Sequence, residues 1–246
     1  MNTINLDNDY FLEIKNTNIS NIDITTDITS LRLHQIKKKK ILLLKIDFNT
    51  FQEKNYKKIL RKLLSIKNFL LLTHTKIGLL KDSKKCIGYL VNYDKNNKKH
   101  NDFILGINAI LYKTRYERYN YIYDTACDYL DSFFYGKNLC DFKDNKCGEK
   151  RNTSSTIGCC RHYKVKWLGP LTKFVKCEHL TENYTCGAKC IGCKLFTCDY
   201  LEKKGVKFRI RDILLLNVFF NPIQKYFIRY MVFTPKEKVL KTLMFF

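Results

Sequence analysis

This chain is most tightly patterned at Cys186-Gly-Ala-Lys-Cys190-Ile-Gly-Cys193, the densest part of a cysteine block. Thiolates are soft, charged ligands, and the two-residue gap from Cys190 to Cys193 suits two ligands of one metal. We expect Gly192 to let the backbone turn toward that metal. The block holds nine of the eleven cysteines of the chain: Cys140, Cys147, Cys159, Cys160, Cys177, Cys186, Cys190, Cys193 and Cys198.

The cysteine usage indicates a compartment in which thiols stay reduced. The first residues, Met1 to Asp9, carry early acids and lack the basic cap and apolar run of a secretory signal peptide, so we expect a cytoplasmic protein. A dense cysteine cluster in a reducing compartment is more often a metal site than a disulfide framework. The alternative is that several of these cysteines are small buried apolar residues, which is plausible for each one singly but not for the whole block.

The metal and its ligand set remain open at this point. Four thiolates fit either Zn(II) or an iron–sulfur cluster, and the sequence does not distinguish these cofactors. His162 and His179 lie within the block and could replace a thiolate, although the cysteines already suffice. Cys86 and Cys127 lie outside it, on an expected strand and an expected helix, and we expect both to be core residues.

One spacing in the block resembles an enzyme motif. The pattern C-x3-C-x2-C of Cys186, Cys190 and Cys193 resembles the cluster motif of radical S-adenosylmethionine enzymes. The resemblance implies three thiolates that leave one iron open for the cofactor. In that family an aromatic residue usually precedes the third cysteine and most of a barrel follows, whereas here Gly192 precedes Cys193 and only residues 194–246 follow. An iron–sulfur enzyme is therefore the alternative function.

Three further elements resemble, in order, the zinc- or iron-chelating cysteine-cluster family over about residues 140–198. The counterparts are the adjacent pair in Gly158-Cys159-Cys160, the C-x-x-L element Cys177-Glu-His-Leu180 and the final element Cys193-Lys-Leu-Phe-Thr-Cys198. Lys194 stands where the family has arginine. The resemblance implies that these cysteines chelate zinc or iron, and it assigns no reaction.

The charge of the chain indicates a class of partner. The formal net charge is +22, which attracts polyanions, chiefly nucleic acid or anionic lipid. The alternative is compositional drift, because Lys, Asn, Ile, Tyr and Phe are all abundant. The longest uncharged apolar stretch, from Ile213 to Ile223, is too short to span a membrane. The sequence contains no phosphate-binding glycine loop and no H-E-x-x-H motif. Their absence weakens the case for an enzyme and leaves that question open.

The expected fold class is α+β. We expect a poorly ordered leader over 1–36, a small mixed α/β region over 37–135, a loop-rich, cysteine-rich metal-binding module over 136–205 and C-terminal helices over 206–246 that pack on the rest. The oligomeric state is not predictable from these patterns.

Local patterns predict most of the individual elements. Apolar spacing predicts an amphipathic helix over 51–64, capped by Thr50 and Glu53, and helices over 103–111 and 112–134 that stop at Gly136. Apolar runs predict a strand or short buried helix at 41–46 and strands at 69–73 and 86–93. Asn221-Pro222 and Thr234-Pro235 predict two helix starts, with Ile223, Phe227, Ile228 and Met231 facing inward.

Overall fold

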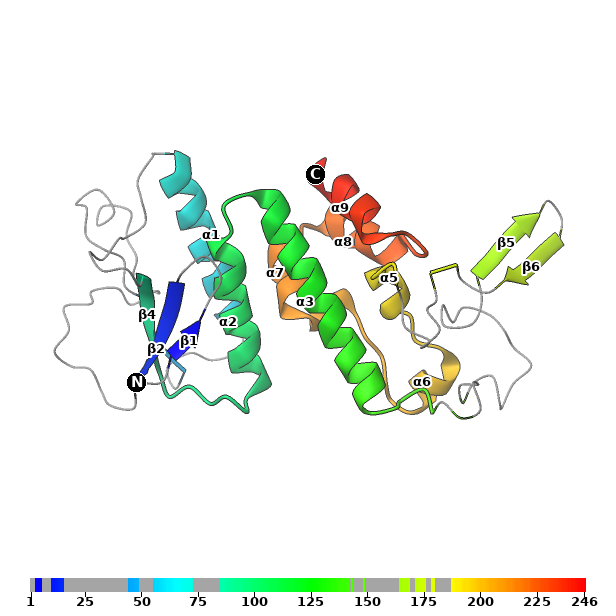
Figure 1. Cartoon of the computed structure of the whole chain (residues 1–246), viewed down its shortest axis with the longest axis horizontal. Helices are drawn as coiled ribbons and strands as arrows, with labels where there is room; N and C mark the ends of the chain where they lie inside the picture. Colours follow the sequence, from blue (N-terminus) through cyan, green and yellow to red (C-terminus); the bar gives the residue numbers. More distant parts are fainter. Residues whose placement is uncertain are drawn as a thin grey trace. The chain divides into compact units, whose positions relative to one another are not determined.

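The computed structural model describes residues 3–5, 10–15, 44–48, 55–72, 85–141, 143, 148, 164–168, 171–175, 178–179 and 187–246. The chain forms two compact units, Met1–Thr114 and Arg115–Phe246, and each is described by itself. Helices dominate, and strands are few (Figure 1).

The first unit contains a four-stranded sheet in the order β1-β2-β4-β3. β1 and β2 pair antiparallel, and β4 pairs parallel with both β2 and β3. Parts of the expected leader therefore lie in the sheet, and the run predicted as a strand or short helix contributes β3. The strands are β1 (Thr3–Asn5), β2 (Tyr10–Lys15), β3 (Leu44–Asp47) and β4 (Lys85–Val91).

The described part of this unit also contains two helices, α1 (Tyr56–Leu72) and α2 (Lys98–Leu111). Gly106 of α2 lets the helices approach closely, because a Cβ atom there would lie 2.5 Å from Leu60 Cδ1 on α1. The strand predicted at 69–73 is wrong over 69–72, which form the end of α1. A short apolar run has no period that separates a strand from a buried turn of helix. The expected caps, Thr50 and Glu53, lie outside the described residues.

The second unit is built on the long helix α3 (Arg115–Gly136), which ends at the predicted glycine. α3 contacts α5, α7 and α9, and Figure 1 shows α7 on one side of it and α5, α8 and α9 on the other. Its buried apolar residues recur every three or four positions, as a helix with one apolar face requires: Tyr119, Ile122, Tyr123, Ala126, Cys127, Leu130 and Phe134. Cys127 is thus the core residue that we predicted.

The predicted helical C-terminus is confirmed, since four helical segments follow residue 209. They are the 3-10 helix η3 (Ile210–Asp212), α7 (Leu214–Phe219), α8 (Pro222–Tyr230) and α9 (Lys236–Met244). Within the cysteine block lie the short helices α5 (Ile191–Lys194) and α6 (Asp199–Lys203) and an antiparallel pair that the sequence did not predict, β5 (Lys164–Leu168) with β6 (Leu171–Val175). No helix within the described ranges has both the length and the apolar character for crossing a membrane.

The start of α8 follows the prediction. Asn221 Oδ1 accepts a hydrogen bond from Gln224 N at 2.8 Å, Gln224 Oε1 accepts one from Asn221 N at 3.0 Å, and Pro222 occupies the first turn. The start of α9 differs. Pro235 is the cap position, while the Thr234 hydroxyl donates to Val232 O at 3.0 Å within the preceding turn, so Thr234 is not the helix cap.

The inward-facing side of α8 was predicted incorrectly at Ile223. Ile223 is 54% exposed, whereas Gln224 and Ile228 are buried. Gln224 can be buried because its Nε2 donates to Tyr119 Oη at 3.0 Å and to Leu243 O at 2.9 Å. A buried amide is tolerated when its hydrogen bonds are made, so the buried side of α8 includes Gln224 and is not the purely apolar stripe that we predicted.

Candidate metal centre

Cys190 and Cys193 lie together at the corner where α8 turns into α9. Cys190 is the residue before α5 and Cys193 lies within it; they are 1% and 6% exposed. The N–H of Phe233 donates to Cys193 Sγ at 3.1 Å, and the Cys190 thiol donates to Met231 O at 3.3 Å. The loop after α8 therefore surrounds both sulfurs with backbone polar groups.

The surroundings of Cys190 favour the thiolate, the form that binds metals. The Cys193 side chain is the main group that lowers the pKa of Cys190 below its ordinary value, and backbone N–H groups of Cys193, Thr234 and Phe233 act in the same direction. Burial opposes them by desolvating the charge, but the hydrogen bonds prevail.

Gly192 is required here for a reason different from the predicted one. Its φ is not positive, so no left-handed turn depends on it. Instead, a Cβ atom at Gly192 would lie 2.9 Å from Ile228 O and 3.0 Å from Arg229 O. The absent side chain lets α5 pack directly against the backbone of the last turn of α8, which holds the two cysteines beside the loop at 231–234.

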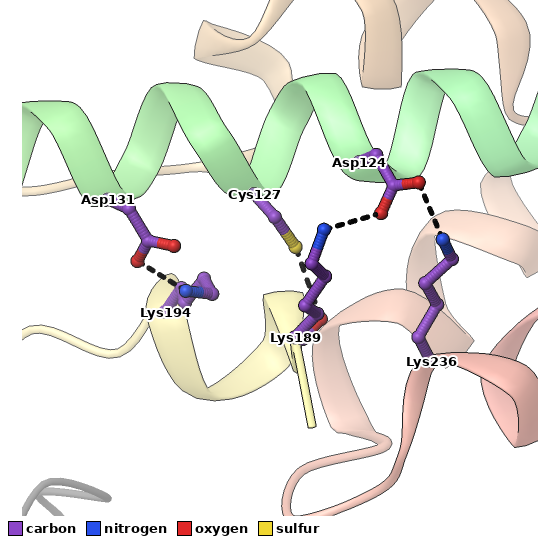
Figure 2. Close-up of polar contacts among 6 residues, drawn as sticks. All are labelled: Asp124, Cys127, Asp131, Lys189, Lys194 and Lys236. Carbon is purple, nitrogen blue, oxygen red and sulfur yellow. Dashed lines mark hydrogen bonds and ion pairs between the residues drawn. The ribbon is translucent and has the colours of Figure 1, made fainter. Parts of the chain in front are cut away.

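Ion pairs fasten the same segment to α3, as Figure 2 shows. Asp124 Oδ1 pairs with Lys189 Nζ at 3.2 Å, and Asp124 Oδ2 pairs with Lys236 Nζ at 2.6 Å. Further along α3, Asp131 pairs with Lys194, whose side chain is only 6% exposed. Lys194 thus carries a buried charge that meets a carboxylate.

Two further side chains of α3 bind the backbone of this segment. The N–H of Ile191, the first residue of α5, has no acceptor within the helix and donates to Tyr123 Oη at 3.1 Å. The Cys127 thiol donates to Lys189 O at 3.1 Å. Burial raises the pKa of both Tyr123 and Cys127, so both groups act here as neutral hydrogen-bond partners.

The other described cysteines of the block are Cys140 and Cys198, both partly exposed. Their segments meet, because the hydroxyl of Tyr200, in the first turn after Cys198, donates to Asp141 Oδ2 at 3.4 Å. The N–H of Gly148 also donates to Cys140 O at 2.8 Å. The five remaining predicted ligands lie outside the described residues: Cys147, Cys159, Cys160, Cys177 and Cys186.

One backbone contact links two elements of the block. The N–H of Gly187 donates to His179 O at 2.8 Å. This contact brings the C-x-x-L element, which contains His179, beside the start of the C-x3-C-x2-C element. The Nε2 atom of His179 lies 3.5 Å from Glu178 Oε1. Of the other residues weighed from sequence, His162 lies outside the described residues, and so does Cys186, on which the radical S-adenosylmethionine alternative depends.

Within the described ranges, no three His, Cys, Asp or Glu side chains come together as a metal site. The described residues therefore provide a pair of sulfurs, which is half of a four-ligand set. Sequence patterns do not predict that Tyr123, Asp131 and Phe233 position this pair, because each lies far along the chain from Cys190 and Cys193.

Comparison with protein-family models, with curated proteins and with solved structures found no match to this chain. Any function must therefore be argued from the geometry and chemistry of its own residues.

Proposed function

We propose that this protein binds zinc or an iron–sulfur cluster through Cys190, Cys193 and further cysteines of its block. The observation that carries the proposal is the pairing of two buried thiols with a backbone donor, the Phe233 N–H at 3.1 Å from Cys193 Sγ. Metal-bound thiolates keep negative charge that such donors stabilise, and the outer contacts orient the ligands.

The remaining ligands of this centre are proposed from the chain neighbourhood. The Gly187–His179 hydrogen bond supports Cys177 and Cys186 as the partners, because each lies within two residues of that contact in the sequence. Together with Cys190 and Cys193 they make four thiolates, enough for a closed structural zinc site or a cluster. The meeting of the Cys140 and Cys198 segments supports a second centre with Cys147, Cys159 or Cys160.

A metal at this place would have a structural effect that follows from its neighbours. The pair lies where α5 contacts both α3 and α8. Binding energy from a metal that is absent in the unfolded chain adds to the folding free energy of the unit. The cysteine block would then be a metal-folded module, in a protein that we place in the reducing cytoplasm.

Cobalt(II) tests the proposed ligands directly. Co(II) replaces zinc in thiolate sites, and each Co–S bond adds to an intense charge-transfer absorption. We expect the full chain, stripped of metal under reducing conditions and loaded with Co(II), to show this band. The variant Cys190→Ser/Cys193→Ser should lose a large part of it, while Cys127→Ala, a matched buried cysteine of α3, should retain it. An unchanged spectrum in the double variant would exclude the pair as ligands.

We also propose nucleic acid as the partner class, because the chain carries 45 Lys and Arg against 23 Asp and Glu. A phosphate backbone releases counterions when it meets such a surface, so the affinity should fall steeply with salt. Binding that does not depend on salt would contradict this part of the proposal.

A further inference from the structure

The exposed apolar side chains of the described residues gather at the C-terminal end. Eight large apolar residues are exposed in the parts of the chain that the structure describes, and six of them lie between 223 and 246. Scattered exposed apolar residues are ordinary, whereas a cluster marks a contact surface. We name five of these the C-terminal aromatic face: Ile223, Tyr226, Tyr230, Phe245 and Phe246.

The rings of this face are arranged as neighbours. Ile223, Tyr226 and Tyr230 recur at helical spacing on the side of α8 opposite its buried residues. The Tyr226 and Tyr230 rings lie 4.5 Å apart, and the Arg229 guanidinium lies 5.6 Å from the centre of the Tyr230 ring. Phe246 stacks on Phe227 at 5.0 Å. The face thus offers flat, partly prearranged rings with a cation beside them.

The charge around these rings selects the kind of partner. Residues 221–246 contain five Lys or Arg and one acidic residue. Arg229 on α8 and Lys238 and Lys241 on α9 are all exposed. A second copy of the chain would bring like charges together, which opposes self-association. A polyanion that also presents flat apolar surfaces complements both features.

We propose that the C-terminal aromatic face binds single-stranded nucleic acid, with Tyr226 and Tyr230 stacking on bases and Arg229, Lys238 and Lys241 contacting phosphates. Unpaired bases expose the π-faces that aromatic side chains stack on, whereas a duplex hides them within its own stack. This inference rests on the proposed nucleic-acid partner and is independent of the metal.

The test compares two double variants of the full chain that differ only in whether the rings remain. Tyr226→Leu/Tyr230→Leu keeps apolar bulk and removes the rings, and Tyr226→Phe/Tyr230→Phe keeps the rings. Fluorescence anisotropy measures binding to labelled oligothymidylate and oligouridylate of about 15 nucleotides, to a duplex of the same length and, by competition, to heparin. Tyr226 and Tyr230 are both exposed. Both double variants should therefore unfold at the same temperature as the wild type, and a thermal unfolding curve verifies that each is folded.

We expect the Leu variant to bind the single strands roughly 5- to 100-fold more weakly and the Phe variant to bind like the wild type. The slope of log affinity against log salt concentration should be the same for the Leu variant and the wild type. Arg229→Gln should reduce the magnitude of this slope by about one. Heparin, which has no bases, should bind the wild type and the Leu variant equally. The thymidylate and uridylate arms tell whether DNA or RNA binds more tightly.

Three results would overturn the inference. Equal single-strand affinity of the Leu variant and the wild type would show that nucleic acid binds elsewhere on the chain, leaving the proposed partner intact. A wild-type chain that binds no oligonucleotide at low salt would remove the proposed partner itself. A wild-type dimer that the Leu variant converts to a monomer, with nucleic-acid affinity unchanged, would assign the face to self-association.

Discussion

The substitution Gly192→Ala probes the packing that positions the cysteine pair. In an ordinary helix, replacing Gly by Ala stabilises a protein by about 0.5–1 kcal/mol, because Ala loses less backbone entropy on folding. At Gly192 the new Cβ would lie 2.9 Å from Ile228 O and 3.0 Å from Arg229 O, whereas ordinary Cβ contacts begin at 3.4 Å. Both oxygens belong to the backbone of α8, so neither can move aside by a rotamer change.

The two effects oppose each other, and their magnitudes decide the sign. Overpacking that shifts backbone costs about 1–3 kcal/mol, which exceeds the gain in helix propensity. We therefore expect Gly192→Ala to lower the free energy of unfolding by about 0.5–2 kcal/mol. Urea unfolding followed by circular dichroism measures this change as a lower midpoint at an unchanged slope.

Gly136→Ala is the matched control. Gly136 ends α3, and a Cβ atom there would meet nothing within 4 Å. Its replacement should leave stability unchanged or slightly raised, by less than about 1 kcal/mol. If Gly192→Ala stabilised the protein as much as Gly136→Ala does, α5 could not pack on the last turn of α8 as described.

Three other changes test the supports of the same unit. Asp131→Asn removes the carboxylate that faces the buried Lys194, and it should destabilise the protein by about 2 kcal/mol in urea unfolding, less than for a fully buried pair because Asp131 is partly exposed. Gln224→Met keeps the volume but removes the buried hydrogen bonds from Gln224 Nε2 to Tyr119 Oη and Leu243 O, and we expect a loss of about 1–3 kcal/mol in thermal or urea unfolding. Burial raises the pKa of Cys127, so the folded thiol stays protonated while the unfolded thiol ionises above about pH 8.5. The unfolded state then binds fewer protons, and the free energy of unfolding of the wild type should fall relative to Cys127→Ala by up to about 1.4 kcal/mol per pH unit above that pH.

Each of these three predictions has an outcome that would contradict it. Asp102→Asn removes the partner of Lys98 on α2, whose side chain is 51% exposed, and should cost less than about 0.5 kcal/mol, so an equal effect of Asp131→Asn would mean that Lys194 is not buried against it. Full stability of Gln224→Met would show that the amide is not needed inside the unit. Parallel stability curves of wild type and Cys127→Ala across the alkaline range would show that the thiol is not desolvated.

Local sequence signals predicted the elements whose cause is local. Asn221 and Pro222 start α8, and Gly136 ends α3, because capping and helix termination depend on a few neighbouring residues. The run at 69–72 was misassigned because its apolar pattern suits both strand and helix. Thr234 was misassigned because its hydroxyl bonds to Val232 O, a competing local partner that a cap motif does not reveal.

The arrangement of the candidate centre could be predicted only in part. The spacing of Cys190 and Cys193 predicts that they act together, since three residues apart is a short distance in any conformation. The role of Gly192 and the donor Phe233 could not be predicted, because both depend on how α5 packs against a corner far along the chain. The same holds for the ion pair of Asp131 and Lys194, which joins residues from separate helices.

If Cys190 and Cys193 hold a metal, as we propose, the metal content of the purified protein depends on them. The full chain, purified without oxygen and without added metal, is analysed for zinc, iron and sulfide alongside Cys190→Ser/Cys193→Ser and Cys127→Ala. We expect near-stoichiometric zinc, or iron with sulfide and a broad absorption near ~400 nm, in the wild type and in Cys127→Ala. The double variant should lose at least one metal centre. A wild-type protein without zinc or iron would show that the chain holds neither metal, and unchanged metal content in the double variant would show that Cys190 and Cys193 are not ligands.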